Sequence, residues 1–159
     1  MDAAEKNNVA KALGMIPSGC FVLTASDAGH SSGILVSWVQ QAGFDPPAVS
    51  VAIKHGRSVQ LLVERSGQFV LNTLGEDGPD LFKHFAKGFE SEGSAFAGLR
   101  ARPSPAGVIL EDAVACLCCK VTGKVDAGDH VVYVATVIDG AVHRDARPSV
   151  RIRTNGLNY

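Results

Sequence analysis

The sequence predicts a mainly β fold, in which short antiparallel strands form a barrel and a few short helices are appended to it. Strand-like runs recur along most of the 159 residues, separated by Gly, Pro, Asp and Ser. Helical spacing is confined to about three short segments. With 46% hydrophobic and 19% charged residues, the chain has a globular composition and the length of one domain, predicted over 1–159. Together these observations favour an antiparallel β-barrel.

The first predicted elements are a helix and a hairpin. Residues 3–13 have helix-forming composition, with Asp2 as a plausible N-cap and Gly14 as a stop. Strands are predicted over 19–26 and 33–40, because both runs are apolar and rich in β-formers. The residues between them are turn formers, so we expect the two strands to pair as a hairpin.

The middle of the chain alternates between strand and helix. Pro46-Pro47 disfavours helix and opens a third strand over 48–53. Apolar residues return to helical spacing over 58–64, and Gly67 ends that helix. A further strand is predicted over 68–74.

The second half begins with a short helix over 80–86. Residues 87–107 are rich in Gly, Ser, Ala and Pro, which predicts a long loop of the kind that often carries function. Two long strands follow over 113–125 and 130–139, joined by a tight turn, and a polar tail is expected from Gly140.

The charge pattern argues against a nucleic-acid partner. The formal net charge is −1, and a nucleic-acid surface needs a concentrated positive field. The densest basic group is Arg147, Arg151 and Arg153, which we interpret as a solvated tail. No apolar run approaches the roughly 18 residues that cross a bilayer, and no targeting segment is visible, so a soluble protein is expected.

Four cysteines lie at positions 20, 116, 118 and 119. Their spacing matches no zinc site, so no metal site is predicted, although a metal or a redox switch stays open as an alternative. On a strand, Cys116 and Cys118 would point to one face and Cys119 to the other. Buried thiols in a reducing compartment are the simplest interpretation.

Polar groups gather at two predicted strand ends. Val36 to Gln41 alternates apolar and polar residues, which fits either a half-buried strand or a set of uncharged hydrogen-bonding groups for a flavin. Lys54 and Arg57 lie beside a helix N-terminus, which is a generic anion site. The alternative is a polar connection in which Ser58 is the N-cap. No Walker loop or dinucleotide glycine fingerprint occurs.

Three further positions could carry chemistry. Asn72 lies within a strand and could be satisfied by backbone alone. Phe85 could fill the core or face a ligand. Asp129 and His130 follow the tight turn, where the histidine could be an ordinary surface residue or a titratable group at a site.

Several of these segments together resemble the flavin reductase-like family, whose members bind FMN in a split β-barrel with Greek-key-like connections. The resemblance rests on Ser37-Trp38-Val39 with Phe44-Asp45-Pro46-Pro47, on Leu81-Phe82-Lys83-His84-Phe85 with Phe96-Ala97-Gly98, on Gly128-Asp129-His130, and on the ending Asn155 to Tyr159. It is most similar to the C-terminal flavin reductase module of the flavodiiron proteins of oxygenic phototrophs. The chain lacks the other modules of those proteins, and its Arg151-Ile152-Arg153 segment departs from the pattern.

The resemblance implies a role for each candidate residue. His130 would be the catalytic residue, placed to contact the nicotinamide or the flavin edge, with Asp129 orienting it. The segment starting Lys83 and continuing through Ala86-Lys87-Gly88-Phe89 would fold over the flavin. The implied FMN contacts are Val36, Ser37, Trp38, Val39, Gln40, Asn72, Phe85 and Asp129 for the ring and turn, and Lys54, Arg57 and Ser58 for the phosphate.

The function implied is hydride transfer from NADH or NADPH to bound FMN, with electrons passed to a partner such as a flavodiiron core. A homodimer is implied as well, in the chloroplast stroma or the cytoplasm of a phototroph. Two alternatives stay open: an FMN electron-transfer module that another reduced protein feeds, and a pyridoxamine-phosphate oxidase-like protein, against which the Gly128-Asp129-His130 turn counts.

Overall fold

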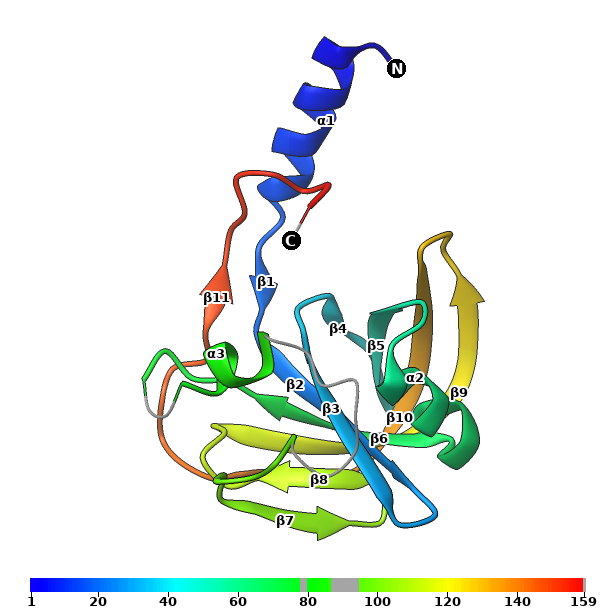
Figure 1. Cartoon of the computed structure of the whole chain (residues 1–159), viewed down its shortest axis with the longest axis vertical. Helices are drawn as coiled ribbons and strands as arrows, with labels where there is room; N and C mark the ends of the chain where they lie inside the picture. Colours follow the sequence, from blue (N-terminus) through cyan, green and yellow to red (C-terminus); the bar gives the residue numbers. More distant parts are fainter. Residues whose placement is uncertain (78–79, 87–94, 159) are drawn as a thin grey trace.

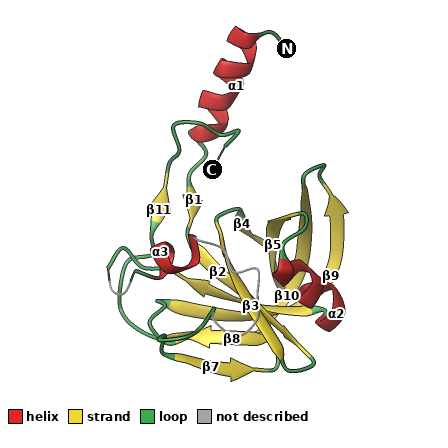
Figure 2. Cartoon of the chain, in the orientation of Figure 1, coloured by secondary structure: helices red, strands yellow, loops and turns green. Residues whose placement is uncertain are grey.

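Seven antiparallel strands form the main sheet, in the order β3-β2-β6-β9-β10-β5-β4 (Figure 1). The structure is a computed structural model and describes residues 1–77, 80–86 and 95–158. The strands are β2 (Phe21–Asp27), β3 (His30–Val36), β4 (Val39–Phe44), β5 (Pro47–Lys54), β6 (Gln68–Thr73), β9 (Ala115–Asp126) and β10 (His130–Val142). The prediction of a mainly β, antiparallel fold is confirmed (Figure 2).

The hairpin expected between the first two strands is also confirmed. β2 and β3 pair along their whole length, and their turn consists of Ala28 and Gly29, both with positive φ. Two consecutive residues with positive φ make the tight turn whose twist matches a hairpin.

A second hairpin lies where a long loop was predicted. β7 (Ala101–Ser104) pairs with β8 (Gly107–Leu110), so the loop prediction is wrong for this part, whereas residues 87–94 lie outside the described residues. β8 is buried against the main sheet because the hydroxyl of Thr24 donates to the carbonyl of Val108 at 2.7 Å and accepts from its amide at 2.9 Å. Non-local contacts therefore make strands from residues that look like a loop.

Two short helices pack on the barrel. α2 (Ser58–Ser66) ends at Gly67 in the left-handed conformation, as the glycine predicts. Its N-cap is Arg57 rather than Ser58, which is the first helical residue. α3 (Leu81–Ala86) begins where the Asp80 carboxylate accepts from the amide of Lys83 at 2.8 Å.

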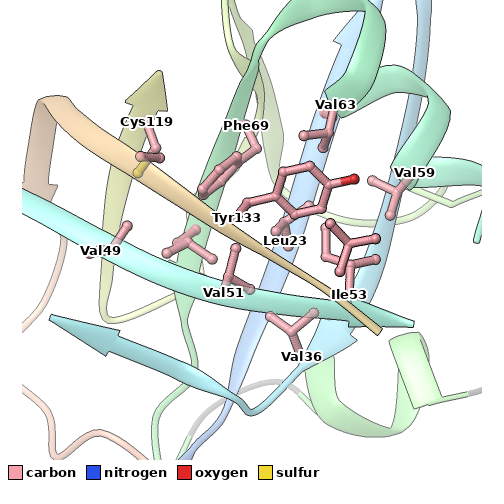
Figure 3. Packing of buried hydrophobic residues seen from close by; sticks show 14 residues of the cluster. Leu23, Val36, Val49, Val51, Ile53, Val59, Val63, Phe69, Cys119 and Tyr133 are labelled. Carbon is pink, nitrogen blue, oxygen red and sulfur yellow. The ribbon is translucent and has the colours of Figure 1, made fainter. Parts of the chain in front are cut away.

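The main core lies between α2 and the strands (Figure 3). Val59 and Val63 of α2 are fully buried against Leu23 and Ile53, and the Tyr133 ring lies among them. The Tyr133 hydroxyl donates to Glu64 of α2 at 2.5 Å. Burial and this hydrogen bond raise the pKa of Tyr133 to about 12, so the phenol stays neutral at all physiological pH values.

The two ends of the chain form a projection that we call the terminal arm: α1 (Ala3–Gly14), the connection 15–17, β1 (Ser18–Gly19), β11 (Val150–Arg151) and residues 152–157. β1 pairs with β11, and α1 stands beyond them, away from the barrel (Figure 1). The α1 prediction is confirmed, with Asp2 as N-cap in a capping box. The polar tail predicted from Gly140 is not observed, because β10 continues to Val142 and β11 follows.

A close backbone crossing holds the arm together. The amide of Gly156 donates to the Ala10 carbonyl at 2.7 Å, and the amide of Arg153 donates to the Gly14 carbonyl at 3.0 Å. The second bond satisfies one of the carbonyls that the end of a helix leaves without a partner. A Cβ on Gly14 would lie 2.3 Å from the Arg153 carbonyl oxygen, and one on Gly156 would lie 2.2 Å from Leu13. Only glycine fits at either position.

All four cysteines are buried and free. Cys116 and Cys118 pack in one apolar cluster with Ile109, whereas Cys119 belongs to the main core, so the predicted alternation of faces is confirmed. Burial raises the pKa of the Cys119 thiol to about 12, and it raises the pKa of Cys116 and of Cys118 as well. The reactive thiolate form is therefore scarce at neutral pH.

We expect folded protein at pH 8 to resist alkylation at Cys119, because the thiolate needs a pH near 12 and the sulfur is inaccessible. Mass spectrometry after iodoacetamide treatment should show labelling of Cys119 in urea-unfolded protein and almost none in folded protein. Equal labelling rates in the two states would contradict the packing role.

Candidate functional site

A cavity of about 470 Å³ lies at the base of the terminal arm. Its walls come from the junction between β3 and β4, the end of β5, the start of α2, helix α3 and the arm itself. The described residues that line it are Ser18, Cys20, Ile34, Leu35, Val36, Ser37, Trp38, Ala52, Ile53, Lys54, Arg57, Phe82, Phe85, Ala86, Arg151 and Arg153.

The β3–β4 junction places Ser37 and Trp38 at this cavity. One strand was predicted over 33–40, but the chain breaks there, since β3 ends at Val36 and β4 begins at Val39. β3 pairs with β2 and β4 pairs with β5, so the chain crosses from one edge of the sheet to the other at the break. The carbonyl of Trp38 accepts from the amide of Ala52 at 3.0 Å, and its side chain stays 36% exposed.

His130 lies beside Trp38. It starts β10 and pairs in register with Lys54 of β5, and its ring centroid lies 4.7 Å from that of Trp38. Its Nδ1 lies 2.8 Å from Oδ1 of Asp129, and this hydrogen bond lowers the pKa of Asp129. The side chain of His130 is 6% exposed and that of Asp129 is 76% exposed. A carboxylate on one ring nitrogen fixes the orientation of an imidazole.

The turn before His130 is as tight as predicted. Gly128 has a φ of +85°, and its amide donates to the Asp126 carboxylate at 2.9 Å. The Ala127 amide donates to the His130 carbonyl at 2.8 Å. The positive φ explains the glycine, because a side chain there would be strained.

Four cationic side chains line the cavity. Lys54 ends β5 and Arg57 caps α2, as the predicted anion site requires. Arg151 and Arg153 come from the arm, so the prediction that these two belong to a solvated tail is wrong. Arg151 pairs with Ser18 of β1, so this segment runs beside the start of the chain and is not a free tail. Among the described lining residues, none is acidic.

Two phenylalanines of α3 contribute aromatic faces. Phe85 is buried and lines the cavity, and its ring would lie 3.1 Å from a Cβ on Gly33, so the glycine gives it room. Phe82 also lines the cavity, and the Arg151 guanidinium stacks 3.6 Å above its ring. The sequence does indicate that Arg151 and Arg153 could act together, because residues two apart share a face where the chain is extended.

Other predicted contacts lie elsewhere. Asn72 is fully buried in β6, and its amide bonds to backbone groups of Val22, Val108 and Leu110, which is the alternative that its strand position left open. Ser58 is half-buried with its hydroxyl 3.3 Å from that of Ser32. Val39, Gln40, Asp129 and His130 are likewise outside the cavity lining, and His130 adjoins the cavity only through its contact with Trp38.

The residues present fit a flavin. The wall from Ile34 to Val36 with Phe85 offers an apolar surface to a flat ring, and the uncharged Ser37 adds a hydrogen-bonding group. Lys54 and Arg57 at the rim suit a phosphate. The cavity size lies within the range of small-molecule sites.

In the described part of the chain, no three His, Cys, Asp or Glu side chains come together as metal ligands. Nor does any described helix have the length and apolar character that crossing a membrane requires.

Comparison with known sequences gives a consistent picture. Residues 13–156 match the family described as flavin reductase like domain. Diflavin flavoprotein A 1 of Synechocystis sp. is 36% identical over 138 residues, which cover 86% of this chain and 24% of the relative. A Nostoc sp. protein of the same diflavin flavoprotein A series is 37% identical over 152 residues, covering 94% of this chain and 26% of the relative. These relatives are flavodiiron proteins, and the chain spans about a quarter of their length.

Solved structures agree. Nitrilotriacetate monooxygenase component B from Mycobacterium thermoresistibile has a TM-score of 0.82 and 26% identity, covering 97% of this chain and 86% of its own. Flavin reductase HpaC complexed with NADP+ has a TM-score of 0.77 and 25% identity, and the match covers 95% of this chain and 94% of HpaC. The neighbours have the split-barrel fold, which confirms that prediction. The chain therefore belongs to the flavin reductase like domain family.

Proposed function

We propose that the protein is an NAD(P)H-dependent flavin reductase that uses FMN. The observation that carries the proposal is the meeting, in one cavity, of an apolar aromatic wall and the cations Lys54 and Arg57, with the Trp38–His130 pair at its edge. The family match favours this function over the pyridoxamine-phosphate oxidase-like alternative.

Different residues would bind the phosphate and the ring of FMN. Lys54 and Arg57 would hold the FMN phosphate through charge-assisted hydrogen bonds, while the wall from Ile34 to Trp38 and Phe85 would hold the ring. Bound FMN would supply the acceptor for a hydride from the nicotinamide. The protein then has to orient the two rings and exclude water from between them.

His130 is proposed as the residue that positions the nicotinamide. Its ring is held by the hydrogen bond to Asp129 and by the contact with Trp38, so its orientation is fixed. Hydride transfer needs the reacting rings at roughly 3–3.5 Å, and a displaced nicotinamide loses that geometry.

The function is tested by mixing FMN-loaded protein with NADH or NADPH without oxygen and following the flavin absorbance. Bleaching by either donor is expected. If neither donor bleaches the flavin while dithionite does, the reductase proposal fails and an electron-transfer module fed by another protein takes its place.

We expect His130→Ala to retain FMN but to slow its reduction about tenfold or more at saturating NAD(P)H, because positioning acts on the rate rather than on flavin binding. Stopped-flow absorbance measures this rate, and His30→Ala, at an exposed hairpin position, is the matched control. An unchanged rate in His130→Ala would remove the residue from the proposal.

The setting of the activity is proposed from the relatives. We infer that the chain works as one domain within, or beside, a flavodiiron system of a phototroph, to which it would deliver electrons. The four free thiols fit a reducing compartment.

We also propose a homodimer, because the arm exposes Met15, Ile16 and Ile152 at 74%, 60% and 71%. Sedimentation equilibrium should give twice the chain mass, and a monomer at micromolar concentration would refute the dimer.

A further inference from the structure

The terminal arm aims two arginines into the cavity. Residues of an extended segment alternate between its faces, so Arg151 and Arg153 point one way and Val150 and Ile152 the other. The apolar pair is 62% and 71% exposed, while both arginines line the cavity. The Arg151 guanidinium lies 3.6 Å from the Phe82 ring centroid and that of Arg153 lies 5.2 Å from the Trp38 ring centroid.

Neither arginine has a carboxylate partner among the described residues. Two other arginines of the described chain do have carboxylate partners: Arg100 pairs with Glu111 and Asp112, and Arg144 pairs with Asp77. The Nε of Arg153 is buried and has no hydrogen-bond partner within the described chain. A guanidinium stacked on an aromatic face keeps its N–H groups in its own plane, where they can donate to a bidentate anion.

The cavity therefore has two separate cationic pairs. Lys54 and Arg57 come from the β5–α2 connection, and Arg151 and Arg153 come from the arm. FMN carries a single phosphate, which one pair suffices to bind. The second pair thus indicates a second phosphorylated group in the same cavity.

We propose that Arg151 and Arg153 form a subsite for the phosphate groups of the nicotinamide dinucleotide. This inference rests on the proposed function, in that Lys54 and Arg57 hold the flavin phosphate. Arg153 lies over Trp38, which in turn contacts His130, so the subsite adjoins the residue proposed to position the nicotinamide ring. The donor would then be held at both ends, by its ring and by its phosphates.

The test is titration calorimetry of the FMN-loaded protein with NAD+ and NADP+, which bind without reducing the flavin. The variant Arg151→Gln/Arg153→Gln keeps much of each aliphatic stem and removes both charges. We expect its affinity for the dinucleotide to fall at least about tenfold, with FMN affinity changed less than about twofold. Arg147→Gln, an exposed arginine outside the cavity, should change neither.

A charge-retaining variant separates binding from folding of the arm. Arg151→Lys/Arg153→Lys keeps both charges but loses the planar, stacked guanidinium, so its dinucleotide affinity should lie between that of the Gln variant and that of the unmutated protein. A larger loss for NADP+ than for NAD+ would assign the pair to the 2′-phosphate, and equal losses would assign it to the pyrophosphate; both support the subsite.

Other outcomes overturn it. These are unchanged dinucleotide affinity in the Gln variant, no dinucleotide binding by the unmutated protein, or an equal loss of FMN affinity, which would place the pair in the flavin site. Flavin-free protein is titrated with the same dinucleotides in parallel. If the protein fails to bind FMN, the proposed function is contradicted, but the effect of the arginine variants on dinucleotide affinity can still be measured. Arginine-dependent dinucleotide binding without flavin reduction would likewise refute the reductase and leave the subsite standing.

Discussion

Asn72→Ala should lower the free energy of unfolding by about 2–4 kcal/mol. The Asn72 amide nitrogen donates to the carbonyls of Val22 and Val108, both at 3.2 Å, and its oxygen accepts from the amide of Leu110 at 2.8 Å. These bonds tie β8 to the main sheet at a position with no solvent exposure. Alanine would leave the Leu110 amide buried without its acceptor, and a buried donor without a partner is costly.

Urea denaturation followed by circular dichroism measures this loss. Asn8→Ala, on the exposed face of α1, is the matched control and should stay within about 0.5 kcal/mol. The same variant also decides the role of the residue. If Asn72 only joins strands, the fraction that folds should bind FMN as the unmutated protein does, whereas a stable variant with weakened FMN binding would return Asn72 to the cofactor contacts.

Lys54→Ala combined with Arg57→Ala should weaken FMN binding by about tenfold to a hundredfold. Each residue would contribute a charge-assisted hydrogen bond to the phosphate, and such bonds contribute roughly 1.5–3 kcal/mol when they are shielded from water. Both residues are exposed, so solvent screening reduces the total below the sum of two such bonds, to about 1.4–2.7 kcal/mol, which corresponds to tenfold to a hundredfold. Fluorescence titration of the apoprotein measures the affinity.

Riboflavin, which has the ring and no phosphate, provides the control ligand. Its affinity should be nearly the same in the double variant and in the unmutated protein. Arg65→Ala with Lys120→Ala removes two exposed cations outside the cavity and controls for net charge. Equal losses for FMN and riboflavin would mean that Lys54 and Arg57 act on the fold of the site rather than on a phosphate.

The sequence predicted those helix ends and strand faces that depend only on residues close to them in the chain. Gly67 ends α2 because its φ of +67° suits glycine, and Asp2 caps α1 because its carboxylate accepts from the Glu5 amide. The cysteine alternation in β9 follows from strand geometry alone. The cations Lys54 and Arg57 were identified for the same reason, since they flank a predicted helix start.

Features that depend on distant partners could not be predicted in this way. The strand predicted over 33–40 divides at Ser37-Trp38 because its halves, β3 and β4, form opposite edges of the sheet and pair with β2 and β5. β7 and β8 become strands through Thr24 and Asn72, which belong to other strands. The site role of Arg151 and Arg153 depends on the pairing of β11 with β1, at the other end of the chain.

The crossing at Gly14 and Gly156 has a consequence for the order of folding. The arm contributes little to the buried core and is closed by contacts between the two ends of the sequence, so forming it bears the loop-closure entropy of nearly the whole chain. The barrel shortens that loop when it folds, and the arm should therefore close last. During synthesis on the ribosome, β1 stays without its partner until β11 emerges. A nascent chain would thus carry a folded barrel before it acquires the arginine wall of its cavity.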